Sequence, residues 1–224
     1  MRKTELIDLG TLNYRAAWEK QVFLLEKLKA EKRACQTGVN YLLLVEHPHV
    51  YTLGRNGDKQ NMLIDAIQLK AKNAEFIKVD RGGDITYHGY GQLVAYPIIR
   101  LDVFEIGVKE YVCKLEEVVI RTLLNYGLKG ERLQGAIGVW LDTDTKSARK
   151  ICAIGVRCSG FVTMHGFALN VNTDLNYFNY INPCGFIDKG VTSLEKEINR
   201  KTDMNEIKKL IIQNFQDVFE MEYV

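Results

Sequence analysis

The stretch RGGDITYHGYGQ, residues 81–92, combines two glycine turns with a concentration of polar side chains. Its paired glycines allow positive φ angles and close approach to the main chain, and the β-forming residues between the turns predict a short strand. Arg81, Thr86 and His88 supply a fixed cation, a hydroxyl and an imidazole around this strand. A hairpin with its polar residues in solvent is the alternative. The whole combination favours the border of a ligand site.

Further motifs follow in a defined order: KICAIGVR at 150–157, VTMHGFALNV at 162–171, NPCGF at 182–186 and VTSL at 191–194. Together with residues 81–92 they resemble the lipoyl(octanoyl) transferase family. Enzymes of this family move an octanoyl group from acyl carrier protein onto lipoyl domains. The resemblance extends from about residue 41 to residue 194, and it is specific because all the motifs occur in the family's order.

The resemblance implies the fold shared by biotin and lipoate protein ligases, with no cofactor and no metal. The implied partners are octanoyl-acyl carrier protein as donor, and as acceptor either lipoyl domains of 2-oxoacid dehydrogenase complexes or the glycine cleavage H protein. Neither nucleic acid nor membrane is expected as a partner.

Two residues are expected to carry the chemistry. Cys184 lies between Pro183 and Gly185, which leave little bulk to hide its sulfur, although a buried structural cysteine is the more common case. The resemblance assigns Cys184 the acyl-thioester position. A lysine that opens a strand is normally solvated, and the residues alone favour that reading for Lys150. The resemblance instead places Lys150 beside the thiol, where it lowers the pKa of the cysteine and moves its proton.

A second set of residues is expected to bind the acyl substrate, and many of its members are small enough to leave room for a linear chain. His165 is expected to be a hydrogen-bonded structural group. The set is Arg81, Gly82, Gly83, Asp84, Ile85, Thr86, Tyr87, His88, Ala153, Ile154, Gly155, Gly166, Phe167 and Ala168.

Composition narrows the class of protein. The 224 residues are 46% hydrophobic and 26% charged, which is ordinary for a soluble globular protein able to bury a substantial core. A net charge of +2 does not indicate nucleic-acid binding, and no apolar run or leader is long enough to predict a membrane span or signal peptide. Five cysteines without a CxxC pair favour neither a disulfide framework nor a zinc site, so a cytoplasmic location is expected.

The pattern of apolar residues predicts one catalytic domain over residues 1–224, of the α+β class, with packed helices on a mixed, largely antiparallel sheet. Helices are expected at 13–32, 65–74, 108–126 and 202–219. Strands are expected at 5–9, 41–45, 50–53, 76–79, 85–87, 93–99, 137–141, 150–156 and 161–171. The first of these is expected to be an edge strand, and Pro97 predicts an edge or terminal position for 93–99.

Cys152 is a departure from the family, which often has alanine at this position. Strand alternation places the Cys152 side chain on the same side as Lys150. The sequence leaves open whether Cys152 lies in the acyl site as a second thiol.

Two other functions remain open from the sequence. An ATP-dependent lipoate or biotin ligase would share this fold and a glycine-rich stretch, but it would need adenylate formation and no nucleophilic cysteine. A non-catalytic binding module would bind lipoyl domains or carrier protein and transfer nothing.

Overall fold

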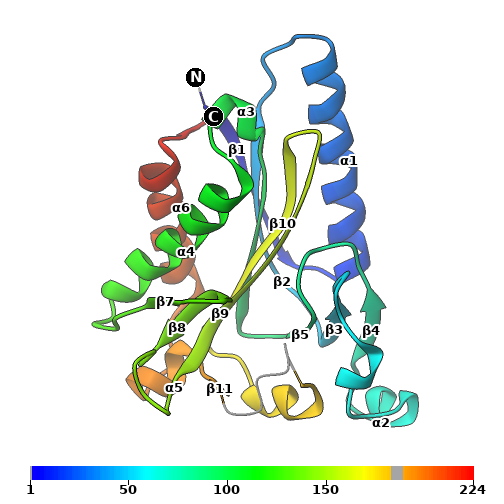
Figure 1. Ribbon diagram of the computed structural model, residues 1–224, viewed down its shortest axis with the longest axis vertical. Coiled ribbons are helices and arrows are strands. Elements are labelled where there is room, and N and C mark those ends of the chain that lie inside the picture. Colours follow the sequence, from blue (N-terminus) through cyan, green and yellow to red (C-terminus); the bar gives the residue numbers. More distant parts are fainter. Residues whose placement is uncertain (1, 183–188) are drawn as a thin grey trace.

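A nine-stranded mixed sheet forms the centre of the computed structural model, which describes residues 2–182 and 189–224 (Figure 1). Its strands follow the order β12-β1-β2-β6-β10-β9-β8-β7, and β11 pairs with β9 beside this path. Neighbours from β2 to β7 are antiparallel, whereas β1 pairs in parallel with β2 and β12, and β11 in parallel with β9. The strands are β1 (Lys3–Thr11), β2 (Asn40–Glu46), β6 (Gln92–Ile98), β7 (Glu131–Leu133), β8 (Ala136–Leu141), β9 (Arg149–Ser159), β10 (Val162–Asn170), β11 (Gly190–Val191) and β12 (Glu222–Tyr223).

The described residues also form a smaller sheet and a set of helices. The small sheet has the order β4-β3-β5, with β3 (Val50–Leu53), β4 (Glu75–Lys78) and β5 (Ile85–His88). The helices are α1 (Tyr14–Arg33), α2 (Ala66–Ala71), α3 (Leu101–Phe104), α4 (Val108–Leu124), α5 (Leu194–Ile198) and α6 (Met204–Phe219), with short 3₁₀ turns η1 (Lys59–Asn61) and η2 (Leu175–Tyr180). The predicted α+β class with a largely antiparallel sheet is confirmed. No helix within 2–182 or 189–224 is long and apolar enough to cross a membrane.

Helices cover both faces of the large sheet. On one face α1 packs against β2, β6 and β10, and on the other face α4 and α6 lie side by side (Figure 1). β2 contributes to both cores, because Leu42 and Leu44 face α4 and α6 while Leu43 faces α1. This strand is therefore buried on both faces.

Helix α1 begins where the sequence predicts. The Asn13 side chain accepts a hydrogen bond from the Ala16 N–H at 2.9 Å, which satisfies a donor that the first helical turn leaves unpaired. On α1, Val22 is 39% exposed while Gln21 is fully buried. Gln21 is buried because its side-chain oxygen accepts the His165 backbone N–H at 2.9 Å.

Two predictions of strand position are wrong. β1 is not an edge strand, since the C-terminal β12 pairs with its outer side. β6 is not at an edge either, since β2 and β10 pair with it on both sides. The sheet tolerates Pro97 because the pairing of β6 with β10 ends at Ala95, so the missing N–H falls beyond the last paired residue on that side.

Candidate active site

A cavity of about 490 Å³ lies along the β9–β10 hairpin and is closed on another side by the glycine turn that precedes β5. Its floor consists of small residues in directly opposed pairs. Ala153 pairs with Ala168, and Gly155 pairs with Gly166. Because no bulky side chain projects from these positions, the floor leaves room for a narrow, elongated apolar ligand.

The glycine turn rests directly on β9. The Gly82 N–H donates to the Val156 carbonyl at 2.9 Å, which joins the small sheet's turn to the large sheet. A Cβ atom at Gly155 would lie 2.9 Å from the Gly82 oxygen and 3.1 Å from Cδ of Arg81. Glycine at 155 is therefore required for the two backbones to approach this closely.

The Arg81 side chain holds this turn in place. Its guanidinium donates to the Thr52 carbonyl at 2.7 Å and to the Thr52 hydroxyl at 3.0 Å, and it also donates to the Gly82 carbonyl at 3.0 Å. These bonds fix the guanidinium beside the cavity that it lines. The guanidinium is thus held against the main chain of Thr52 and Gly82.

A connected row of buried polar residues lines the cavity. His88 shares a short hydrogen bond with Gln92 (2.8 Å), and Gln92 donates to Asn170 (2.9 Å). The His88 ring stacks on Tyr14 with ring centroids 5.8 Å apart. Burial is the main reason why the pKa of His88 lies well below its ordinary value, and the charges of neighbouring residues lower this pKa further. His88 is therefore neutral at neutral pH.

His165 has an unusual backbone for a strand residue. Its φ is +59°, in the left-handed region, and its Nε2 lies 2.9 Å from a carboxylate oxygen of Asp80. Burial lowers the pKa of His165, although the bond to Asp80 acts in the opposite direction. With Asp80 accepting from Nε2–H, the neutral imidazole presents Nδ1 as an acceptor, and this buried Nδ1 has no partner within the described residues.

Lys150 also lines the cavity, near the start of β9. The β8–β9 ladder has an irregularity here: Val139 pairs with Cys152, and the next residue, Trp140, pairs with Lys150. One residue of β9 is thus extra, as in a β-bulge, and a bulge changes the face toward which the following side chains point.

The bulge decides the question that the sequence leaves open for Cys152. Cys152 is fully buried in the core beneath α4 and does not line the cavity, whereas Lys150 does. Burial in this core raises the pKa of the Cys152 thiol far above its ordinary value. Cys152 is therefore an unreactive packing residue, although strand alternation alone placed it beside Lys150.

The predicted substrate-binding residues lie around this one cavity, with one exception. Tyr87 points to the opposite side of β5, where its ring stacks on Tyr177 with centroids 4.9 Å apart. Strand alternation sends it there, because Thr86 and His88 on either side face the cavity. The expectation for Tyr87 is wrong, and the other predicted binding residues all line the cavity: Arg81, Gly82, Gly83, Asp84, Ile85, Thr86, His88, Ala153, Ile154, Gly155, Gly166, Phe167 and Ala168.

The proposed nucleophile, Cys184, lies outside the described residues. The chain is described again from Lys189, and Lys189, Gly190 and Val191 all line the cavity. Val191 pairs with Lys150, and the Thr192 N–H donates to the Lys150 carbonyl at 2.9 Å.

Several lining residues carry no signal in the sequence. Tyr14 comes from the start of α1, Tyr96 from β6, Val108 and Val112 from α4, and Trp140 from β8. None belongs to a motif, and each looks like an ordinary core residue in its own segment. Only the strand pairing could have indicated Trp140, which lies directly opposite Lys150. Across residues 2–182 and 189–224, no three His, Cys, Asp or Glu side chains are grouped to hold a metal ion.

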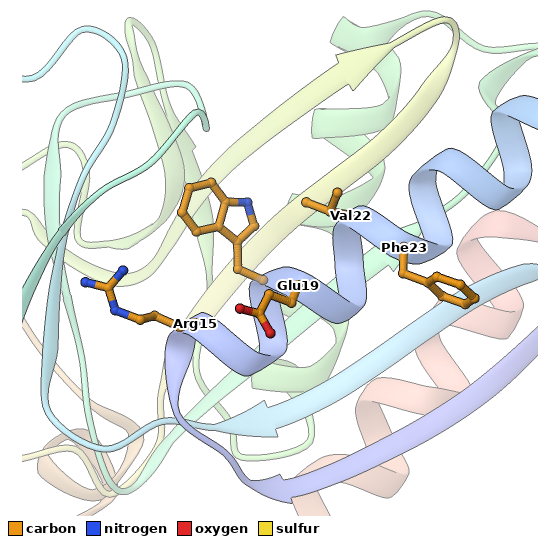
Figure 2. Close-up of a pocket in the computed structure, with 5 residues that line it drawn as sticks. Arg15, Glu19, Val22 and Phe23 are labelled. Carbon is orange, nitrogen blue, oxygen red and sulfur yellow. The ribbon is translucent and has the colours of Figure 1, made fainter.

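A second hollow, along the outer side of α1, lacks the features of a reactive site. It is lined by Arg15, Trp18, Glu19, Val22 and Phe23, all from one helix. Figure 2 shows the labelled side chains Arg15, Glu19, Val22 and Phe23 pointing away from the helix in different directions rather than toward a common point. We therefore assign the reactive site to the cavity beside β9 and β10.

The buried histidines predict a loss of stability in acid. His47 lies between the Leu12 carbonyl (2.6 Å) and the Tyr96 hydroxyl (2.8 Å), and burial lowers its pKa from 6.5 to about 4. As the pH falls, His47 in the unfolded chain therefore binds a proton at a higher pH than His47 in the folded protein. The stabilisation from neutral His47 is complete above pH 6.5 and is lost as the pH falls from 6.5 to about 4. Complete loss would amount to roughly 3 kcal/mol.

Urea unfolding at a series of pH values tests this expectation. The free energy of unfolding of the wild type should fall steeply in that range, and His47→Gln, which removes the titrating group, should show a shallower fall. Residual slope in the variant is expected from His88. Equal slopes in the two proteins would show that His47 is not a source of acid sensitivity.

The architecture around this cavity is that of a lipoate protein ligase. A bi-partite lipoate protein ligase from Thermoplasma acidophilum matches 100% of this chain and 86% of its own with a TM-score of 0.73. Its sequence is only 16% identical, so this likeness shows the fold alone. It confirms the predicted lipoate-ligase fold.

The chain belongs to the lipoyl protein ligase A/B catalytic domain family, whose model matches residues 13–216. The octanoyltransferase of Bacteroides thetaiotaomicron is 55% identical over 206 residues, which cover 92% of this chain and 91% of that protein. The octanoyltransferase of Flavobacterium johnsoniae is 51% identical over 100% of this chain and 99% of that protein. The family resemblance seen in the motifs is confirmed.

Proposed function

We propose that this chain is an acyltransferase that moves an octanoyl group from acyl carrier protein to a lysine of a lipoyl domain, in the cytoplasm. The acceptors would be the lipoyl domains of 2-oxoacid dehydrogenase complexes or the glycine cleavage H protein. The observation that carries this proposal is a cavity of about 490 Å³ that is floored by small residues and lined by Lys150. It occurs in a chain about half identical to octanoyltransferases.

The cavity supports binding of a linear acyl chain. Ala153, Ala168, Gly155 and Gly166 leave its floor flat, and Val94 lines it beside Ala168. Burying about six methylene groups at about 0.8 kcal/mol each would contribute roughly 5 kcal/mol to binding of the acyl group. Discrimination by two carbons of chain length would rest on about 1–3 kcal/mol.

The reaction proceeds in two acyl transfers. The Cys184 thiolate attacks the carbonyl of the octanoyl thioester, a new C–S bond forms, and the phosphopantetheine thiol of the carrier protein leaves with a proton from Lys150. The amine of the acceptor lysine then attacks octanoyl-Cys184, an amide forms, and the Cys184 sulfur leaves as a thiolate. The proton that the amine loses goes to Lys150, which restores the ammonium used in the first transfer. Exchange between thioesters is nearly balanced and amide formation is downhill, so the reaction needs no ATP.

Proton transfer is the larger contribution that we propose for Lys150. Lowering a thiol pKa from about 8.5 to about 6.5 raises the thiolate fraction at pH 7 roughly 25-fold. The weaker nucleophilicity of the more acidic thiol, with a Brønsted slope of about 0.45, reduces this gain roughly 8-fold. A well-placed proton shuttle is worth roughly 100-fold or more.

Independence from ATP separates this function from its alternatives. Octanoyl transfer from octanoyl-carrier protein to an apo lipoyl domain should proceed in nucleotide-free buffer, which intact-mass analysis of the acceptor detects. The reason is that the donor thioester already supplies an activated acyl group. The same mixture with ATP and magnesium is the control and should give the same yield.

Each alternative gives a different result in this assay. Transfer that requires ATP and magnesium would identify a ligase. Binding of both partners without any transfer would identify a binding module.

A further inference from the structure

The Lys150 side chain lies against β8 in an ordered way. Its Nζ lies over the ring face of Trp140, 4.7 Å from the ring centroid. Both residues line the cavity and are direct partners in the β8–β9 ladder. An ammonium at this distance from an indole face is attracted by the negative face of the ring.

The Trp140 ring cannot easily move away. The side chain is 2% exposed, and its indole N–H donates to the Ala136 carbonyl at 2.9 Å. The hydrogen bond and the burial fix the plane of the ring, so the same face is always presented to Lys150.

Gly138 supports the stem of the same lysine. A Cβ atom at Gly138 would lie 3.4 Å from Cε and 3.5 Å from Cδ of Lys150, so the methylene groups of the lysine pass directly over this residue. Gly138 also has φ +127°, and a Cβ there would lie 2.5 Å from the Cys152 carbonyl oxygen. A side chain at 138 would therefore displace β9 as well as the lysine.

We propose that Trp140 is the positioning residue for Lys150: its ring face holds the ammonium in the cavity, in its protonated form and pointing along a fixed direction. This inference rests on the proposed role of Lys150. In the first acyl transfer the leaving thiolate takes its proton from Lys150, so only the protonated lysine is productive. Attraction to the indole favours that form and extends activity to higher pH.

Other charged groups around Lys150 are already paired. Glu116 of α4 bonds Arg132 at 3.0 Å and accepts the Gly138 N–H at 3.2 Å. Arg149, the preceding residue, forms an ion pair with Glu197 of α5 at 2.6 Å and another with Asp142. Among the described residues, Lys189 lines the same cavity as Lys150, and Cys152 is a buried thiol near it.

Fluorinated tryptophan tests the proposal without changing the shape of the ring. Fluorine withdraws electrons from the ring face, so attraction to the ammonium falls in the order monofluoro-, difluoro- and trifluorotryptophan. The chain has 2 tryptophans, Trp18 and Trp140. In a Trp18→Phe background the analogue is therefore incorporated at position 140 alone, and Trp18 does not line the cavity.

Two measurements are made with each analogue. The first is the pH dependence of kcat/KM for octanoyl transfer, and the second is the titration of the ¹³Cε resonance of Lys150. This resonance is assigned by its absence from the spectrum of Lys150→Arg. Both should report a pKa for Lys150 that falls stepwise with fluorination, by about half a unit in total. The pKa that describes the acidic limb of the kcat/KM profile should not change. Trp140→Leu should lower the same pKa at least as far as trifluorotryptophan does.

Two outcomes would overturn the proposal, and a third would overturn only the role of Lys150 on which it rests. A Lys150 resonance whose pKa does not move with fluorination would show that the ring does not stabilise the ammonium. A pH profile that shifts on both limbs equally would indicate a general structural change. Full activity of Lys150→Ala would remove the proposed role of the lysine itself, and the resonance titration would still report separately whether the ring holds the ammonium.

Discussion

Replacing Cys184 with alanine should abolish octanoyl transfer and the covalent octanoyl adduct together. Octanoyl-carrier protein mixed with the wild-type protein should leave one octanoyl group on this chain, because the first acyl transfer does not need the acceptor. Intact-mass analysis detects the adduct, and peptide mapping at mildly acidic pH, where the thioester survives, should locate it on Cys184. The expected effect is loss of all measurable turnover.

Cys152→Ala is the matched control, because it removes the other thiol of the motif region. Cys152 is fully buried beneath α4, and burial raises its pKa, so its sulfur is neither accessible nor ionised. The variant should therefore keep most of the adduct and most of the turnover, with at most a modest loss of stability from the small cavity it creates. An adduct that persists in Cys184→Ala and disappears in Cys152→Ala would overturn the assignment of the nucleophile.

Replacing Lys150 with alanine should reduce turnover by roughly 100-fold or more. The side chain lines the cavity and packs over Gly138 and Trp140. The β9 ladder uses only the backbone of this residue, and alanine provides the same backbone. The far-ultraviolet circular dichroism and the free energy of unfolding should therefore stay close to those of the wild type. Steady-state transfer of octanoyl to an apo lipoyl domain measures the loss.

Lys150→Arg separates the charge of the lysine from its proton. A guanidinium keeps the positive charge and also interacts with the Trp140 ring, but it does not give up its proton at accessible pH. Turnover should therefore fall nearly as far as in the alanine variant. Near-normal turnover of Lys150→Arg would show instead that charge alone is what this position provides.

Periodicity and turn chemistry were enough to predict most of the individual elements. The N-cap at Asn13, the apolar run that forms β2, and the alternation that forms the β9–β10 hairpin all depend on residues close together in the chain. Local rules describe such elements well, because a helical turn or a hairpin is stabilised within its own segment. The motifs also indicated a site beside residues 81–92, and the structure gathers their residues around one cavity.

The errors have two sources. Pro97 predicts an edge strand, but β6 lies between β2 and β10, and both of these partners are distant in the sequence. Tyr87 is expected in the site with its neighbours, although the period-two alternation within β5 turns it toward Tyr177. The first error comes from tertiary pairing, and the second comes from a local rule that was not applied.

The sequence by itself determined the family, the α+β class and the residue types available for acyl transfer, because these are carried by local patterns and short motifs. Only the tertiary structure decided which of those residues meet. The β-bulge opposite Trp140 turns Lys150 into the cavity and Cys152 into the core, and no property of residues 150–152 alone specifies it. The physical reason is that a side chain's direction in a strand depends on its register with the neighbouring strand, and here that neighbour is β8.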